Sequence, residues 1–182
     1  MNTIKPLIDY GHYHFGENKV QEAIEKWTDI KSSFDNLQLH MIGKLQTNKV
    51  KYVIPLFDYI HSLDNIKLAK KISFEQKKKN KKLKIFIQIN IGNENQKSGI
   101  NIESLKNFYE ICINELDLNI IGLMCIPPEN EDIKTHFKKM SELQKLIGVR
   151  ELSMGMSSDY LEAIKFGASF VRIGSKIFGK RS

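Results

Sequence analysis

The chain has 182 residues, of which 41% are hydrophobic and 27% charged, proportions that are ordinary for a soluble globular protein of one domain. No apolar run reaches the roughly 20 residues that a membrane-spanning helix needs. Residues 1–10 lack the apolar core and the small-residue cleavage site of a secretory signal peptide. These features argue against a membrane protein or an exported one, and we expect a cytoplasmic protein.

The net charge of +7 raises the question of a nucleic-acid partner. Much of this charge comes from Lys77–Lys82, which reads KKKNKK at the end of an expected helix, where lysines complement the helix dipole. No aromatic residues interleave the tract to stack on bases. We therefore interpret it as a solvated surface and expect neither nucleic acid nor a membrane as a partner. The two cysteines, Cys112 and Cys125, lie in no CxxC or Cys/His pattern and are expected to be free thiols.

Strand-like and helix-like segments alternate along the chain. The clearest strand is LKIFIQINI, which is rich in β-branched and aromatic residues, and amphipathic periodicity indicates helices between the strands. In chain order, the expected elements are helix 4–10, strand 14–16, helix 19–31, strand 37–42, helix 47–57, strand 59–63, helix 65–79, strand 83–91, helix 102–116, strand 119–126, helix 132–147, strand 151–154, helix 159–167 and strand 169–173.

This alternation indicates an α/β fold with a parallel sheet. No GxGxxG turn follows the first strand, which disfavours an open dinucleotide-binding sheet. A (β/α)8 barrel needs eight strands and typically about 200–250 residues, whereas we count seven strands after an initial helix. We therefore expect residues 1–182 to form a single domain, an incomplete TIM-like barrel that lacks its first strand and has two unpaired edges.

Two segments near the end of the chain predict a phosphate site. Functional groups of a parallel barrel gather at the carboxyl ends of its strands, and the loops after strands 7 and 8 frequently bind phosphate. SMGMSSD (153–159) runs from a strand into a helix, whose first N–H groups would face an anion. RIGSKIFG (172–179) brings Gly174 and Ser175 beside it, and glycine allows close backbone approach.

A purely structural interpretation of the same segments stays open. Ser157 or Ser158 is placed to cap the helix that follows it, and Gly174 is suited to a turn. Each segment alone favours this interpretation. The two segments together favour phosphate binding.

Six segments in order carry a family resemblance: FGENKVQEA (15–23), HMIGKLQTNK (40–49), IQIN…KSGI (87–100), GLMCIP (122–127), SMGMSSD (153–159) and VRIGSKIFG (171–179). They resemble the YggS/PROSC family of pyridoxal 5′-phosphate (PLP) homeostasis proteins over nearly the whole chain. The resemblance implies a barrel similar to the N-terminal domain of alanine racemase, with PLP as cofactor. The residues that it implies around PLP are Ser157, Gly174 and Ser175 at the phosphate, Arg172 near the pyridine ring, and Asn18, His40 and Met156 in the pocket.

Arg172 bears on the chemistry that the resemblance implies. A carboxylate beside the pyridine nitrogen keeps that nitrogen protonated and makes PLP an electron sink, whereas a permanently cationic arginine disfavours protonation there. Such a cofactor stabilises carbanions poorly, so we expect storage and delivery of PLP and an effect on amino-acid balance rather than an enzyme. The alternatives are a PLP-dependent amino-acid racemase, a PLP-independent barrel enzyme that binds a phosphorylated metabolite, and, for Arg172 itself, a structural ion pair.

The sequence departs from the family at the cofactor lysine. The family's Schiff-base lysine lies in a Ser-Lys-Thr motif at the end of the first strand, and no such motif occurs here. We therefore expect an N-terminally truncated chain, from a misassigned start codon or a truncated gene product, that binds PLP weakly and without a covalent bond. Lys5 falls in a helix and is not assigned the role. Lys97 is the best remaining amine, although a loop lysine that contacts anions or carboxylates is the favoured interpretation.

Other candidates point to structure rather than chemistry. His61 and Asp64 are spaced for an acid/base pair, but Asp64 is better suited to cap the helix that follows it. His12 and His14 lack metal-ligand spacing with any cysteine or glutamate, so no metal is expected. The expected partners are PLP and PLP-dependent apo-enzymes that receive it, and the chain is expected to be a monomer.

Overall fold

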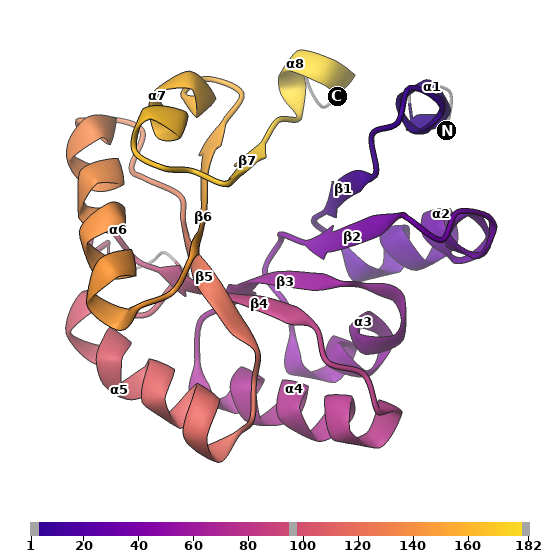
Figure 1. The fold of residues 1–182 in the computed structure, drawn as a ribbon, viewed down its shortest axis with the longest axis horizontal. Helices are drawn as coiled ribbons and strands as arrows, with labels where there is room; N and C mark the ends of the chain where they lie inside the picture. Colours follow the sequence, from indigo (N-terminus) through magenta and orange to yellow (C-terminus); the bar gives the residue numbers. More distant parts are fainter. Residues whose placement is uncertain (1–3, 95–97, 180–182) are drawn as a thin grey trace.

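One parallel sheet forms the centre of the computed structural model, which describes residues 4–94 and 98–179. Its seven strands are hydrogen-bonded in sequence order and curve into a nearly closed barrel (Figure 1). The strands are β1 (His14–Glu17), β2 (Gln38–Met41), β3 (Tyr59–Leu63), β4 (Lys84–Ile89), β5 (Ile120–Cys125), β6 (Glu151–Met156) and β7 (Phe170–Arg172). The expected seven strands and the incomplete barrel are therefore confirmed.

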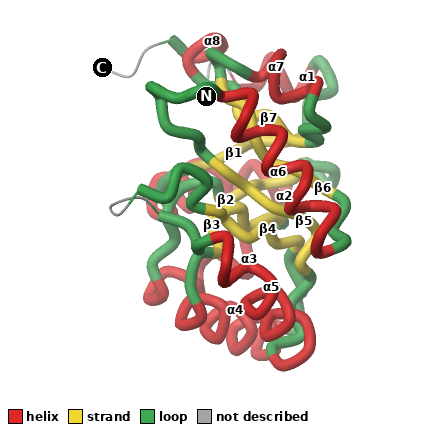
Figure 2. Tube along the Cα trace, turned by 90° about the vertical axis from the view of Figure 1, so that its left-hand side faces the viewer, coloured by secondary structure: helices red, strands yellow, loops and turns green. Residues whose placement is uncertain are grey.

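Helices cover the outer face of the barrel (Figures 1 and 2). They are α1 (Ile4–Asp9), α2 (Val20–Ser33), η1 (Thr47–Lys49), α3 (Val50–Leu56), α4 (Ile66–Lys79), η2 (Ile102–Ser104), α5 (Leu105–Glu110), η3 (Ile111–Glu115), α6 (Ile133–Ile147), α7 (Tyr160–Lys165) and α8 (Ser175–Phe178). The helix expected over 102–116 is three consecutive segments, of which η3 is a π-helix. Among the described residues, no helix combines the length and apolar character needed to cross a membrane.

The barrel is open between its first and last strands. β1 and β7 are the two ends of the sheet order, and they approach the same side of the molecule, together with α1 and α8 (Figure 1). Phe170 of β7 and His14 of β1 point toward each other, with ring centroids 6.3 Å apart. The inner side chains of the two edge strands therefore meet although their backbones do not pair.

The barrel has an outer and an inner apolar layer because strand side chains alternate in direction. The outer layer packs strand residues such as Leu39 and Ile87 against the helices and includes the buried Trp27 of α2. The inner layer is mainly aromatic: it contains Tyr59, Phe86 and Met124, with Phe170 packed against them. At Gly122 a Cβ atom would lie 2.1 Å from the carbonyl oxygen of Glu151, so β5 and β6 require a glycine there.

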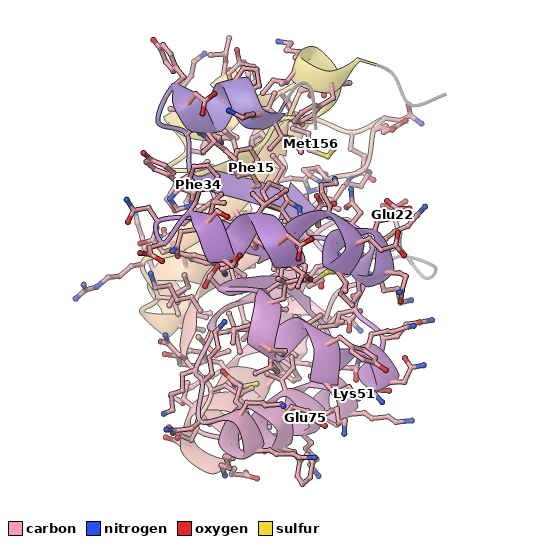
Figure 3. The ribbon with its side chains drawn as sticks, turned by 90° about the vertical axis from the view of Figure 1, so that its right-hand side faces the viewer. Phe15, Glu22, Phe34, Lys51, Glu75 and Met156 are labelled. Carbon is pink, nitrogen blue, oxygen red and sulfur yellow. The ribbon has the colours of Figure 1, made fainter. Side chains whose placement is uncertain are left out.

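A buried carboxylate ties β1 to α2. Glu17 accepts hydrogen bonds from Lys26 Nζ and from Trp27 Nε1, each at 2.7 Å. Phe15, labelled in Figure 3, packs against the Trp27 ring with centroids 5.0 Å apart. These contacts fix the strand whose carboxyl end leads to Asn18.

The cap of α4 differs from the sequence expectation. Asn65, not Asp64, is the N-cap residue, and its side-chain oxygen accepts the Leu68 N–H at 2.8 Å. Asp64 instead accepts a hydrogen bond from the Asn65 amide at 2.7 Å. The expected capping by Asp64 is therefore wrong, because the chain enters the helix one residue later. The helix ends at Lys79 and is followed by its C-cap residue Asn80, which has a left-handed backbone with φ of 49°.

Candidate functional site

The loops that follow β6 and β7 meet at the carboxyl end of the barrel. Met156 pairs in register with Arg172, which brings the next residues of both strands together. The Gly174 N–H donates a hydrogen bond to the Ser157 hydroxyl at 3.2 Å. The structure thus brings Ser157, Arg172 and Gly174 together. Met156, labelled in Figure 3, lies at the end of the molecule that carries α8.

Asp159, rather than a serine, organises the loop after β6. It is the N-cap residue of α7, and its carbonyl accepts the N–H groups of Glu162 and Ala163. Its carboxylate accepts the Met156 N–H at 2.5 Å. The expectation that Ser157 or Ser158 caps this helix is wrong, because both lie before the carboxylate that closes the turn. The Ser157 hydroxyl instead accepts the Gly174 N–H, and Ser158 is exposed.

Arg172 extends from β7 across the inner face of the barrel. Its Nη1 donates to the Ser153 hydroxyl at 2.8 Å and its Nη2 to the Cys125 carbonyl at 2.7 Å. Among the described residues, its hydrogen-bond acceptors are thus a hydroxyl and a carbonyl, not a carboxylate. Burial lowers the pKa of Arg172, and the nearby Cys125 and Asp159 offset only part of this effect. A guanidinium has five N–H donors, so this one retains donors for a ligand acceptor.

Ser175 begins α8, a four-residue helix that the sequence analysis did not predict. Gly174 is its N-cap residue, and the Gly174 carbonyl accepts the N–H groups of Ile177 and Phe178. The first N–H groups of a helix have no acceptor within it. Ser175 therefore adds a hydroxyl and a backbone donor next to the Ser157–Gly174 contact.

A row of histidines that the sequence did not predict lines the barrel interior, exposed at His14 and buried at His40 and His61. His14 Nδ1 lies 3.0 Å from His40 Nε2, and His40 Nδ1 lies 2.9 Å from His61 Nε2. His61 Nδ1 lies 2.8 Å from the Ser153 hydroxyl, which also contacts Arg172. The available signal is one inward-facing histidine on each of β1, β2 and β3. The two-residue offset between neighbouring strands that brings these histidines together appears only in the strand register.

Two expected pocket residues, His40 and Asn18, make no hydrogen bond to Ser157 or Gly174 in the described structure. His40 is only 5% exposed, and both of its ring nitrogens are engaged by other histidines, so no ring nitrogen is open to a ligand. Asn18 is exposed and follows β1, with its backbone so close to Gly43 that a Cβ there would lie 2.2 Å from the Asn18 carbonyl oxygen. Their contact with a ligand stays a prediction.

The lysines and cysteines add no further described reactive group. Lys5 lies in α1 and pairs with Asp9 at 3.3 Å, as expected for a helix residue. Lys97 lies outside the described residues. Both cysteines are free thiols, as expected, and burial raises the pKa of Cys112 and of Cys125 to about 12. His61 contacts Ser153 and His40, and no contact joins it to Asp64 in the described structure.

Comparison with known proteins identifies close relatives. The chain matches the family model of the alanine racemase N-terminal domain over residues 1–182. It is 40% identical over 188 residues to the pyridoxal phosphate homeostasis protein of Aquifex aeolicus, covering 98% of this chain and 82% of that protein. It is 35% identical over 189 residues to the pyridoxal phosphate homeostasis protein of Escherichia coli K12, covering 99% of this chain and 81% of that protein.

Solved structures with a similar fold include members of the same group of relatives and a more distant enzyme. PipY of Synechococcus elongatus solved with PLP bound has a TM-score of 0.87 and 31% identity, covering 98% of this chain and 87% of PipY. PipY solved without PLP has a TM-score of 0.89 and 32% identity with the same coverage. An alanine racemase of Clostridium difficile has a TM-score of 0.74 at 16% identity, covering 99% of this chain and 48% of the racemase. The racemase likeness shows the fold alone.

Proposed function

Because this chain belongs to the family of pyridoxal phosphate homeostasis proteins, which have the alanine racemase N-terminal domain, we propose that it binds PLP and takes part in the homeostasis of that cofactor. One observation carries the proposal. The loops after β6 and β7 gather the Ser157 hydroxyl, the Gly174 backbone and the Arg172 guanidinium at the carboxyl end of the barrel.

The chemistry of these groups fits a phosphorylated pyridine. A phosphate accepts hydrogen bonds from hydroxyl and backbone N–H groups, and Ser157, Gly174 and Ser175 supply both kinds. Arg172 is part-buried and has N–H groups beyond the two that it donates to Ser153 and Cys125, so it suits an acceptor such as a pyridine nitrogen. In this assignment Ser157, Gly174 and Ser175 hold the phosphate, and Arg172 approaches the ring.

The same assignment favours storage and delivery over catalysis. PLP serves enzymes as an electron sink, and that property is strongest when its ring nitrogen is protonated. A guanidinium only donates hydrogen bonds, so a ring nitrogen that accepts one from Arg172 carries no proton of its own. The relatives with 35–40% identity are named as homeostasis proteins, whereas the racemase likeness is distant. Cytoplasmic PLP-dependent apo-enzymes are the recipients that this role implies.

A titration of matched serine variants tests the proposal. Pyridoxine 5′-phosphate keeps the ring and phosphate of PLP but lacks the aldehyde, so it does not react with the many surface lysines. Ser157→Ala should weaken its binding about 10–100-fold, because a hydrogen bond to a charged group contributes about 1.5–3 kcal/mol. The control Ser158→Ala removes the neighbouring exposed hydroxyl and should bind like the native chain.

Calorimetry measures the affinity of the native chain and of both variants for pyridoxine 5′-phosphate. Equal affinities for Ser157→Ala and the native chain would overturn the assignment of Ser157. A native chain without measurable binding would overturn the proposed function. A separate incubation with PLP and borohydride shows whether any lysine reacts, and we expect no stoichiometric trapping.

A further inference from the structure

Five side chains from five strands form a continuous polar row through the barrel. The row is His14 (β1), His40 (β2), His61 (β3), Ser153 (β6) and Arg172 (β7), and we call it the histidine row. Its four consecutive contacts are 3.0, 2.9, 2.8 and 2.8 Å long. Ser153 is fully buried, and His61 is 1% exposed. The row ends at the residue that the proposed function places beside the ligand ring.

Aromatic neighbours fix the planes of the two central rings. Tyr59 stacks on His40 with centroids 4.1 Å apart and an interplanar angle of 14°. Phe86 stacks on His61 with centroids 4.3 Å apart and an angle of 21°. The stacks fix the plane of each ring, and the contacts at both nitrogens select its orientation within that plane, because a half-turn of either ring would replace two nitrogen contacts by C–H groups.

The arginine end sets the direction of every hydrogen bond in the row. A guanidinium only donates, so the Ser153 oxygen accepts from Arg172. The Ser153 hydroxyl hydrogen is then free to donate to His61 Nδ1. A neutral imidazole that accepts at Nδ1 carries its hydrogen on Nε2, so His61 donates to His40 Nδ1, and His40 donates to His14 Nδ1.

The opposite direction is disfavoured by an unpaired donor. If His61 donated from Nδ1, the Ser153 oxygen would accept from both His61 and Arg172. The Ser153 hydroxyl hydrogen would then lack an acceptor among the described residues, in a fully buried position. A buried unsatisfied donor costs about 1–3 kcal/mol. The structure therefore favours a single direction, from Arg172 toward His14.

We propose that Ser153, His61, His40 and His14 are positioning residues for Arg172: a hydrogen-bond row of one direction that holds the guanidinium in place for the ligand ring. Only the identity of that ligand rests on the proposed function. The row itself predicts the Nε2–H tautomer for all three histidines. It also predicts that loss of the Ser153 hydroxyl removes one hydrogen bond from His61 and one from Arg172.

Nitrogen-15 NMR tests the row without any ligand. Chemical shifts of labelled imidazole nitrogens distinguish a nitrogen that bears hydrogen from one that does not. In the native chain, His14, His40 and His61 should each show the hydrogen on Nε2. In Ser153→Ala, His61 should become a mixture of tautomers, and the Arg172 Nε–Hε signal should show greater mobility.

A neighbouring serine provides the matched control. Ser62 is 2% exposed, and its hydroxyl has no hydrogen-bond partner in the described structure, so Ser62→Ala is the same truncation without loss of a contact. The three histidines and Arg172 should be unchanged in this variant. A native His61 with its hydrogen on Nδ1 would overturn the proposal. Equal Arg172 mobility in Ser153→Ala and Ser62→Ala would also overturn it.

Ligand binding separates this proposal from the proposed function. Ser153→Ala should weaken binding of pyridoxine 5′-phosphate about tenfold relative to Ser62→Ala, the loss expected for about 1.4 kcal/mol. Equal affinities of the two variants would contradict the positioning of Arg172 for a ligand. If the native chain does not bind the compound, the proposed function fails, and the NMR spectra still decide whether the row holds Arg172.

Discussion

Acid should destabilise this fold through its buried histidines. Burial is the main cause that lowers the pKa of His40 from 6.5 to about 3, and the charges of His14 and Lys84 act in the same direction. Burial also lowers the pKa of His61 well below its usual value, with further contributions from His40 and Arg172. In the unfolded chain both rings regain a pKa near 6.5 and bind protons that the folded chain does not bind.

The sign and size of the effect follow from these pKa values. Between about pH 6.5 and pH 3 the unfolded state holds more protons, so the free energy of unfolding falls as the pH falls. His40 alone accounts for a loss of about 2 kcal/mol between pH 8 and pH 5. That is a large fraction of the 5–15 kcal/mol typical of a domain. His61 adds a loss of the same sign.

Urea unfolding, followed by fluorescence of the single tryptophan, measures the loss at pH 8, 7, 6 and 5. His40→Gln removes one titrating ring, so its loss between pH 8 and pH 5 should be about 2 kcal/mol smaller than that of the native chain. His136→Gln is the control, because this ring lies in α6, outside the barrel, and contacts Glu131 at 2.8 Å rather than the histidine row. The same loss in His40→Gln and the native chain would refute the reasoning, as would a native stability that does not change with pH.

Three further predictions test separate contacts. A Cβ at Gly174 meets no atom within 4 Å, so Gly174→Ala should change the free energy of unfolding by less than about 1 kcal/mol. Calorimetry should nevertheless show that this variant binds pyridoxine 5′-phosphate more weakly than the native chain. Asn65→Ala should lower the free energy of unfolding by about 1 kcal/mol, whereas a larger loss in Asp64→Ala would contradict the observed cap. Trp27→Phe keeps a ring against the core but removes the donor to Glu17. Urea unfolding, followed by circular dichroism because this variant has no tryptophan, should show a loss of about 1–3 kcal/mol, and an unchanged midpoint would contradict that role.

Much of the fold could be predicted because the alternation of strand and helix is local. β3 has the expected bounds, 59–63, since the polar residues Asp58 and Asp64 flank it on each side. α8 was missed because four residues are too few for a periodic signal. The caps were missed because Asp64 and Asn65 are equally suitable cap residues, and only the path of the chain selects between them.

The site was predictable in its polar groups but not in their connections. Ser157 and Gly174 stand at the ends of consecutive strands, so their proximity follows from the parallel topology. The histidine row depends on register instead. His40 and His61 meet only because β2 and β3 pair with His40 opposite Tyr59, an offset that the sequence does not reveal. Strands buried on both faces also hide which side chains point inward.

The central claim is that the loops after β6 and β7 bind a phosphate attached to a pyridine ring. The direct measurement is a calorimetric comparison of pyridoxine 5′-phosphate with unphosphorylated pyridoxine on the native chain. We expect the phosphorylated compound to bind at least about 100-fold more tightly, since several charge-assisted hydrogen bonds are lost without the phosphate. Equal affinities for the two compounds would contradict the claim.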